Sequence, residues 1–270
     1  MKLVHTVAEV RGLLAPEREA GRSIGLVPTM GAFHAGHLAL MAASRAADDK
    51  VVVSLFVNPA QFGPWEDLAR YPRDEAADAA AAEAAGVDVL FVPAVDEVYP
   101  PGFDTWVDPG KLAAVLEGEV RPGHFRGVAT VCTRLFGIVQ PTRAYFGRKD
   151  AQQVAVIKQV VRDLALPLEI VACPTVRDAD GLALSSRNIY LSVEERAAAL
   201  ALPRALQAGL AARHRDSDPA EAAREVLTAE RRLAVDYVAA ADLDGPTLAA
   251  AVRVGSTRLI DNVQLEDPLP

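Results

Sequence analysis

Residues 27–41 read VPTMGAFHAGHLALM and place a short apolar strand, a glycine-containing turn and the start of a helix in direct succession. The alanine-rich segment after the turn predicts a helix over about 37–48. His34 and His37 are three residues apart, so both imidazoles are expected on one side of the first helical turn. A helix that starts directly after a strand is a common phosphate site, because its first backbone N–H groups have no partner within the helix.

The same alternation of strand and helix continues along most of the chain. Strands are expected at 24–28, 51–57, 87–92, 143–147 and 168–172, and further helices at about 74–85, 127–139 and 150–164. This alternation predicts parallel βαβ units and an α/β fold with a Rossmann-like, doubly wound parallel sheet.

The pattern changes after about residue 176. Two helical stretches, 192–215 and 216–232, are followed by expected strands at 236–243 and 257–265. We therefore expect a Rossmann-like domain over 1–176 that binds nucleotide and substrate. A smaller C-terminal α+β domain over 177–270 is expected to close over the site.

Composition excludes several functional classes. A hydrophobic content of 51% with 24% charged residues is typical of a globular protein, and no apolar run approaches the ~20 residues that a membrane span requires. The net charge of −8, without a long basic run, argues against a nucleic-acid partner. The N-terminal stretch carries charges throughout, which predicts a cytoplasmic protein without a secretory signal. Cys132 and Cys173 lack metal-ligand spacing and are expected to be buried thiols.

Two further motifs could contact phosphate. Lys149, in Gly147-Arg148-Lys149-Asp150, follows an expected strand and supplies a local cation, although the motif by itself is more often a solvated turn, here with Asp150 as a helix cap. In Ser185-Ser186-Arg187, two hydroxyls and a guanidinium could bind phosphate oxygens, or they could cap a helix at the domain boundary.

Two glutamines and two long polar segments suggest contacts with a small molecule. Gln61 follows the second expected strand, and Gln153 lies one turn into a helix; neutral amides suit a hydroxylated or carboxylated ligand. Segments 58–73 and 117–126 are long enough to be functional loops, and the second carries Arg121 and His124, a cation and a titratable donor in an expected mobile loop.

Together these stretches resemble the pantothenate synthetase (pantoate–β-alanine ligase) family of the nucleotidylyltransferase superfamily. The motifs occur in the family's order and spacing across residues 27–191: VPTMGAFHAGH, FVNPAQF, DLARYPR, LEGEVRPGHFRGV, YFGRKDAQQ and PTVRDADGLALSSRNIYL. The resemblance implies that the chain is an AMP-forming ligase. It also implies a homodimer located in the cytoplasm. Pantoate and ATP, with Mg²⁺, would give pantoyl adenylate and pyrophosphate, and β-alanine would then displace AMP to give pantothenate.

The resemblance also implies roles for particular residues. His37 (the proton donor), His34 and Lys149 would be catalytic, Gln61 and Gln153 would bind pantoate, and 65–73 would form a gate over the site. The implied ATP-binding residues are Met30, Gly31, Ala32, Phe33, His34, Ala35, Gly36, His37, Gly147, Arg148, Lys149, Asp150, Val176, Leu184, Ser185, Ser186 and Arg187.

Departures from the family pattern concern the metal site and two motif positions. Arg148 replaces the usual acidic residue, and Ala60 replaces the methionine of NPMQF. The protein ligands of magnesium are unknown, and Asp78 is the remaining plausible contact in 74–81. For His34 and His37 alone, a partial metal site or simple packing stays an alternative.

Two alternatives to pantothenate synthesis remain at this point. One is another nucleotidylyltransferase that acts on a different acid or phosphate. The other is a nucleotide-sensing module without catalytic activity.

Overall fold

The computed structural model describes residues 1–64 and 66–266. Contacts divide the chain into two compact units, which we name unit 1 (Met1–Gly147 and Val156–Cys173) and unit 2 (Arg148–Ala155 and Pro174 onward). The expected domain boundary after residue 176 stays a prediction; by contacts alone, residues 148–155 also join unit 2.

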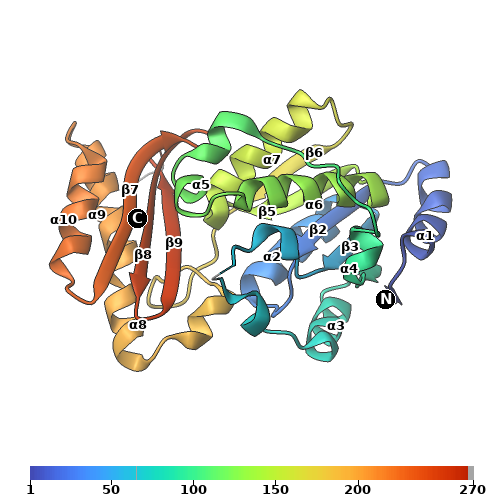
Figure 1. The fold of residues 1–270 in the computed structure, drawn as a ribbon, viewed down its shortest axis with the longest axis horizontal. Coiled ribbons are helices and arrows are strands. Elements are labelled where there is room, and N and C mark those ends of the chain that lie inside the picture. Colours follow the sequence, from blue (N-terminus) through green and yellow to red (C-terminus); the bar gives the residue numbers. More distant parts are fainter. Residues whose placement is uncertain (65, 267–270) are drawn as a thin grey trace. The chain divides into compact units, whose positions relative to one another are not determined.

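Unit 1 is built around a parallel sheet of six strands in the order β1-β4-β3-β2-β5-β6 (Figure 1). The strands are β1 (Lys2–Val4), β2 (Ile24–Thr29), β3 (Lys50–Leu55), β4 (Val89–Phe91), β5 (Arg143–Gly147) and β6 (Glu169–Cys173). The α-helices are α1 (Val7–Glu19), α2 (Ala35–Ala47), α3 (Glu75–Ala84), α4 (Val95–Val98), α5 (Glu117–Val120), α6 (His124–Val139) and α7 (Ala151–Asp163), whose first residues belong to unit 2. The predicted Rossmann-like fold class is confirmed.

The central strands form because both of their faces are covered. Helices α2 and α3 lie on one side of the sheet, and α6 lies on the other (Figure 1). The inner residues of β2 and β3 are mostly buried, with partly buried positions at or near the strand ends, as a parallel sheet between two helical layers requires. Val27 and Val53 pack with Met41 of α2 in the core cluster of this unit.

The order of the strands indicates where a ligand would bind in unit 1. From β2 the chain proceeds to β3 and β4 on one side of the sheet, whereas β5 and β6 lie on the other side of β2. The order therefore reverses between β2 and β5, which is where ligands bind in open α/β sheets, at the carboxyl ends of the strands. The turn before α2 leaves β2 at that edge.

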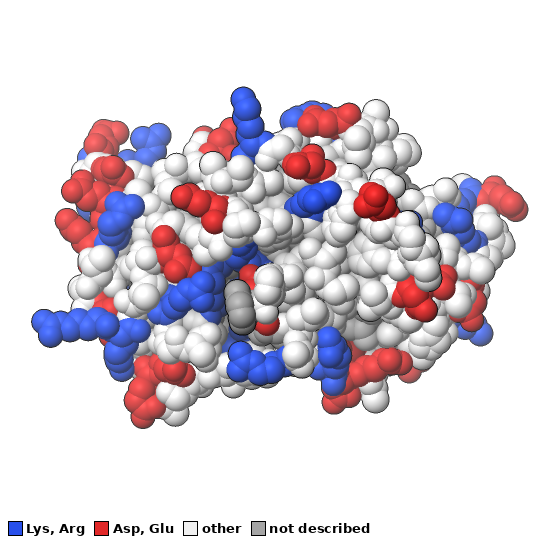
Figure 2. Space-filling model, in the orientation of Figure 1, with Lys and Arg blue, Asp and Glu red and all other residues white. Residues whose placement is uncertain are grey.

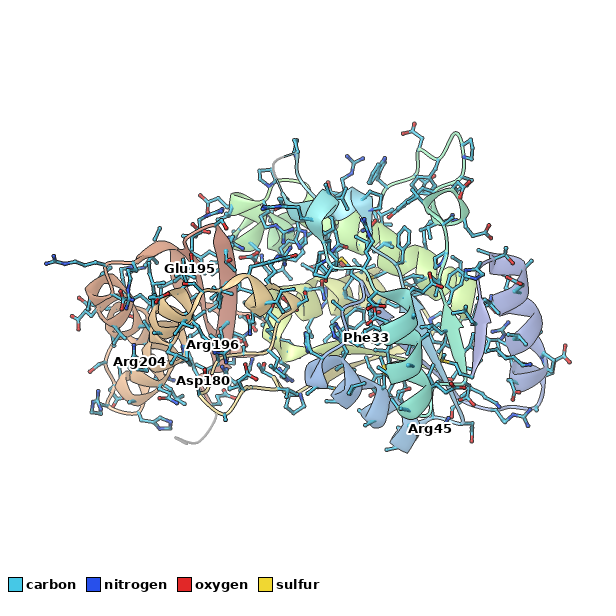
Figure 3. The ribbon with its side chains drawn as sticks, turned by 90° about the horizontal axis from the view of Figure 1, so that it is seen from below. Phe33, Arg45, Asp180, Glu195, Arg196 and Arg204 are labelled. Carbon is cyan, nitrogen blue, oxygen red and sulfur yellow. The ribbon has the colours of Figure 1, made fainter. Side chains whose placement is uncertain are left out.

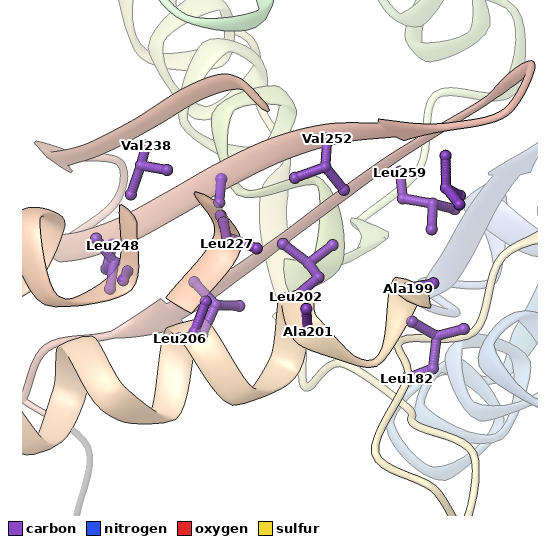
Figure 4. Close-up of a cluster of buried hydrophobic side chains, with 14 of the residues drawn as sticks. Leu182, Ala199, Ala201, Leu202, Leu206, Leu227, Val238, Leu248, Val252 and Leu259 are labelled. Carbon is purple, nitrogen blue, oxygen red and sulfur yellow. The ribbon is translucent and has the colours of Figure 1, made fainter. Parts of the chain in front are cut away.

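Unit 2 contains an antiparallel sheet in the order β7-β8-β9, with helices packed against it. Its main elements are β7 (Leu233–Asp242), β8 (Pro246–Val254), β9 (Thr257–Gln264), α8 (Val193–Ala199), α9 (Ala201–Arg213) and α10 (Pro219–Ala229). Leu202 and Leu206 of α9, Leu227 of α10 and Val252 of β8 meet in its core (Figure 4). This confirms the smaller α+β part predicted from the sequence.

Several elements differ from the predicted ones. The expected helix over 192–215 is two helices, α8 and α9, divided at Leu200. The division is explained by Pro203 in the first turn of α9. Its ring lacks an N–H and clashes with the carbonyl of the preceding turn, so one continuous helix cannot form. Strand β8, like β1 and α1, was not predicted: its sequence, PTLAAAVRV, is rich in alanine, which favours helices.

Charged side chains of both signs are interspersed on the face that Figure 2 draws. None of the helices in the described part of the chain is long and apolar enough to cross a bilayer. Cys132 and Cys173 are buried free thiols, as predicted.

Candidate active site

Helix α2 begins with two histidines that cap it reciprocally. His34 is the N-cap, and its Nδ1 accepts a hydrogen bond from the backbone N–H of Gly36 at 3.1 Å. The backbone N–H of His34 in turn donates to Nδ1 of His37 at 3.3 Å. This is a capping box in which imidazoles replace the usual hydroxyl and carboxylate. The ring centroids are 4.2 Å apart.

These contacts determine where each ring carries its proton. A nitrogen that accepts a hydrogen bond has no proton of its own, so in a neutral ring the proton is on the other nitrogen. For both His34 and His37, Nδ1 is the acceptor, and Nε2–H is therefore the donor. The two imidazoles present N–H groups of the same kind from one helical turn.

The turn before α2 is held by a buried carboxylate. Asp78 of α3 is 4% exposed, and its two oxygens accept the backbone N–H groups of Ala32 at 2.9 Å and Phe33 at 2.7 Å. These bonds hold Ala32 at φ 53°, a region that non-glycine residues rarely adopt. Gly31 has φ 93°, and a Cβ there would lie 2.9 Å from Asp78 Oδ2. The carboxylate therefore shapes the turn.

These contacts bear on two inferences from the sequence. Both oxygens of Asp78 accept hydrogen bonds from backbone amides, so Asp78 anchors the turn, and its contact with magnesium stays a prediction. The backbone N–H groups expected to receive phosphate already have partners at residues 32–34 and 36–38. Anion binding at this turn would therefore depend mainly on the imidazoles. Within residues 1–64 and 66–266, no group of three or more His, Cys, Asp and Glu side chains could hold a metal.

Gln61 is oriented by a buried asparagine. It ends the 3₁₀ helix η1 (Pro59–Gln61), whose N-cap is Asn58, 1% exposed. Asn58 Nδ2 donates to Gln61 Oε1 at 2.9 Å and to the carbonyl of Gly127 at 3.2 Å, and its Oδ1 accepts from the hydroxyl of Tyr99 at 2.8 Å. Because Oε1 of Gln61 is an acceptor here, its NH₂ group points the other way, 3.2 Å from Sδ of Met30. Gln61 thus presents a donor beside the histidine motif.

A second set of contacts fixes the backbone of Gln61. His124 is the first residue of α6, and its Nδ1 lies 2.9 Å from the carbonyl oxygen of Gln61. A carbonyl only accepts, so Nδ1 carries the proton, and Nε2 faces Arg121 Nη1 at 3.1 Å. Burial and the charge of Arg121 lower the pKa of His124 to about 4, so this ring is neutral near pH 7.

Arg121 connects this cluster to segment 58–73. Its guanidinium makes a bidentate pair with Glu66, with Nε–Oε1 2.5 Å and Nη2–Oε2 2.8 Å. Burial alone would raise the pKa of Glu66, but the hydrogen bonds and charge of Arg121 outweigh it and lower the pKa. The expected mobile loop at 117–126 is wrong: α5 and the start of α6 occupy it. Of the expected gate over 65–73, Trp65 lies outside the described residues.

In unit 2, a hairpin brings two expected ATP-binding residues together. The backbone N–H of Leu184 donates to the carbonyl of Val176 at 2.9 Å. Arg196 of α8 pairs with Asp178 at 2.6 Å and with Asp180 at 2.8 Å, and so clamps the hairpin tip (Figure 3). The next segment is the 3₁₀ helix η5 (Ser186–Tyr190), which is capped by Ser185.

The GRKD segment also belongs largely to unit 2. Arg148–Asp150 form the 3₁₀ helix η4, and Gln153 lies in the first turn of α7. Lys149 Nζ lies 3.5 Å from Oδ1 of Asp150. The Arg148 side chain pairs with Asp244, 3.4 Å away in the β7–β8 turn. The residue that departs from the family pattern thus has a partner within its own unit.

The expected site residues therefore form two groups. Unit 1 brings together the Met30–His37 turn and Gln61, and unit 2 contains Val176, the 184–187 segment, Arg148–Asp150 and Gln153. Sequence reasoning missed Asn58 and the anchoring role of Asp78. Asn58 had a local signal, since an Asn before Pro is a typical start of a short helix.

Comparisons with known proteins agree over nearly the whole chain. A model of the family described as Pantoate-beta-alanine ligase matches residues 2–264. Relatives described as pantothenate synthetase, from Moorella thermoacetica and Roseiflexus sp., are each 54% identical over 280 residues, covering 98% of this chain and 99% and 100% of theirs.

Solved structures give the same picture. Pantothenate synthetase from Thermus thermophilus superposes with a TM-score of 0.92 at 48% identity, covering 98% of this chain and 99% of that one. Pantoate-beta-alanine ligase from Francisella tularensis, solved in complex with beta-gamma ATP and beta-alanine, has a TM-score of 0.86 at 33% identity over 100% of both chains.

Proposed function

The chain belongs to the pantoate–beta-alanine ligase family, and from this premise we propose that it joins pantoate to β-alanine in two ATP-dependent half-reactions. In the first, a carboxylate oxygen of pantoate attacks the α-phosphorus of ATP, the bond to the β-phosphate oxygen breaks, and pyrophosphate leaves. In the second, the amine of β-alanine attacks the acyl carbon of pantoyl adenylate, loses a proton and releases AMP. The product is pantothenate.

One observation carries the proposal: the backbone-capped imidazole pair lies in the same unit as an oriented Gln61 amide. His34 and His37 would donate their Nε2–H groups to the phosphates, where negative charge grows as pyrophosphate leaves. Gln61 would donate its NH₂ group to a hydroxyl or carboxylate oxygen of pantoate. A carboxylate is already nucleophilic, so the protein's task is to hold it in line with the α-phosphorus.

The residues of unit 2 carry separate proposals. We propose that Lys149 stabilises the charge around the α-phosphate, that Gln153 binds pantoate, and that Val176 and 184–187 contact adenosine and phosphate. The Francisella tularensis complex supports ATP and β-alanine as substrates. The homodimer and the cytoplasmic location implied by the family stay predictions.

Magnesium would enter with the nucleotide. Mg²⁺ is commonly held by phosphate oxygens and water with only one or two carboxylates. No group of three or more His, Cys, Asp and Glu side chains in residues 1–64 and 66–266 could hold it. Asp78 anchors the turn through two backbone amides, and its contact with Mg²⁺ stays a prediction. We derive no step from Mg²⁺.

The deciding experiment is exchange of labelled pyrophosphate into ATP without β-alanine. We expect exchange only when pantoate is present, and AMP release only when β-alanine is then added. Equal exchange with unrelated acids, or a preference for CTP, would instead indicate another nucleotidylyltransferase. Tight ATP binding without AMP release under any of these conditions would indicate a nucleotide sensor.

A further inference from the structure

Two buried polar residues occupy neighbouring positions on β9, in the part of the chain where the sequence offered no distinctive motif. Asp261 is 2% exposed and Asn262 is 7% exposed. Burying a carboxylate or an amide is costly unless hydrogen bonds replace water, so their partners indicate what the pair does. All of the partners used below lie in unit 2.

Asn262 holds the backbone of the GRKD segment. Its Nδ2 donates to the carbonyl of Arg148 at 2.8 Å and to the carbonyl of Lys149 at 2.9 Å. Both protons of the amide are thereby used on two successive peptide groups. These bonds fix the orientation of the peptide on either side of the Lys149 Cα, from which its side chain projects.

Asp261 holds the hairpin that carries Val176. Arg177 donates to Asp261 through Nη1–Oδ2 at 2.6 Å and Nη2–Oδ1 at 3.0 Å, and its Nη1 also reaches the carbonyl of Gly181 at 3.1 Å. The backbone N–H of Asn262 donates to Asp261 Oδ1 at 2.8 Å. One short stretch of β9 therefore anchors both the GRKD segment and the hairpin.

We propose that Asn262 is a positioning residue that aims Lys149 at the α-phosphate; this inference rests on the proposed function of Lys149. A lysine ammonium is a point charge on a flexible stem, so its direction depends on the backbone that carries it. In-line transfer tolerates little misplacement, and a shift of about 1 Å can cost on the order of 10²-fold in rate. Asp261 holds the hairpin that carries Val176 to the same stretch of β9.

The test is a double-mutant cycle on pantoate-dependent pyrophosphate exchange. Asn262→Ala should lower kcat about 10- to 100-fold with a smaller change in KM for ATP, because it affects alignment more than binding. In a Lys149→Ala background the same substitution should add less than about twofold, since the group it aims is gone. Asn262→Asp, which keeps the size but removes both donors, should match Asn262→Ala.

Controls separate positioning from folding. Gln264→Ala lies on the same strand, two residues on, and removes a bond to Thr247 Oγ1 of 2.8 Å instead; it should keep the wild-type kcat. The number of ATP sites per chain, measured by calorimetry, gives the folded fraction of every variant, including any that is unstable, and kcat is expressed per site.

Three results would overturn the proposal. If the per-site kcat is unchanged in Asn262→Ala while Lys149→Ala is impaired, the proposed role of Asn262 is refuted and the proposed role of Lys149 stands. An equal loss from Asn262→Ala in both backgrounds shows that it does not act through Lys149. Unimpaired exchange in Lys149→Ala refutes the proposed role of Lys149 as well, and so distinguishes that failure from the first.

Discussion

Substituting Gly127 by alanine should displace Gln61, the proposed pantoate-binding residue, because helix α6 crosses the 3₁₀ helix η1 at Gly127 without room for a side chain. A Cβ on Gly127 would lie 2.1 Å from the carbonyl oxygen of Ala60 and 2.7 Å from the Cα of Gln61. Both are backbone atoms, which cannot rotate away. The carbonyl of Gly127 also accepts a hydrogen bond from Asn58, the residue whose Nδ2 orients Gln61.

The size of the effect follows from these distances. An ordinary carbon–oxygen contact is about 3.3 Å, so α6 and η1 must separate by about 1 Å. Forcing a methyl group into a packed contact typically costs about 1–3 kcal/mol of stability. Moving Gln61 by the same distance should lower the rate of adenylate formation on the order of 10²-fold if Gln61 holds pantoate in line.

Gly137→Ala is the matched control, because it lies in the same helix and a Cβ there would meet nothing within 4 Å. Alanine is a better helix former, so this variant should gain about 0.5–1 kcal/mol and keep full activity. Denaturant unfolding gives the stability, and pantoate-dependent pyrophosphate exchange gives kcat and KM. Wild-type exchange in Gly127→Ala would refute the reasoning that this contact places Gln61.

Asp78→Asn should cost about 1–3 kcal/mol of unfolding free energy, since an NH₂ group cannot accept the hydrogen bond from the amide of Ala32 or Phe33; an unfolding free energy equal to that of the wild type would contradict its role as an anchor. The lowered pKa of His124, about 4, means that the unfolded chain binds this proton more readily between pH 4 and 6.5. Acidification through that window should therefore destabilise the fold by up to the order of 3 kcal/mol, and His124→Asn should flatten the decline measured by unfolding at each pH. His37→Ala should lower exchange on the order of 10²-fold with little change in ATP affinity, and a purely raised KM would contradict a transition-state role.

The parallel sheet could be predicted from the sequence because its signals are local. β-Branched runs alternate with alanine-rich helices, and tight turns separate them, so β2, α2 and β3 were predicted to within about two residues at each end. Strand β8 was missed because packing, and not residue preference, makes this alanine-rich segment a strand.

Only the parts of the site formed by residues close together in the sequence could be predicted. Motifs identified His34, His37, Gln61 and Lys149, but some of the groups that hold the backbone around them come from distant elements. Asp78 is 46 residues from Ala32, and Asn262 is 113 residues from Lys149. Such partners leave no periodic pattern in a single chain.

The imidazole cap of α2 affects how mutagenesis of this enzyme must be interpreted. His34→Ala would remove a proposed phosphate donor. It would also remove the N-cap of α2, which by itself costs about 1 kcal/mol of stability. Asparagine is a good N-cap but has no nitrogen at the place of Nε2, so His34→Asn would separate the two losses. If His34 donates to phosphate, the same side chain serves both the reaction and the helix cap, and only a substitution that preserves the cap can measure its effect on the reaction.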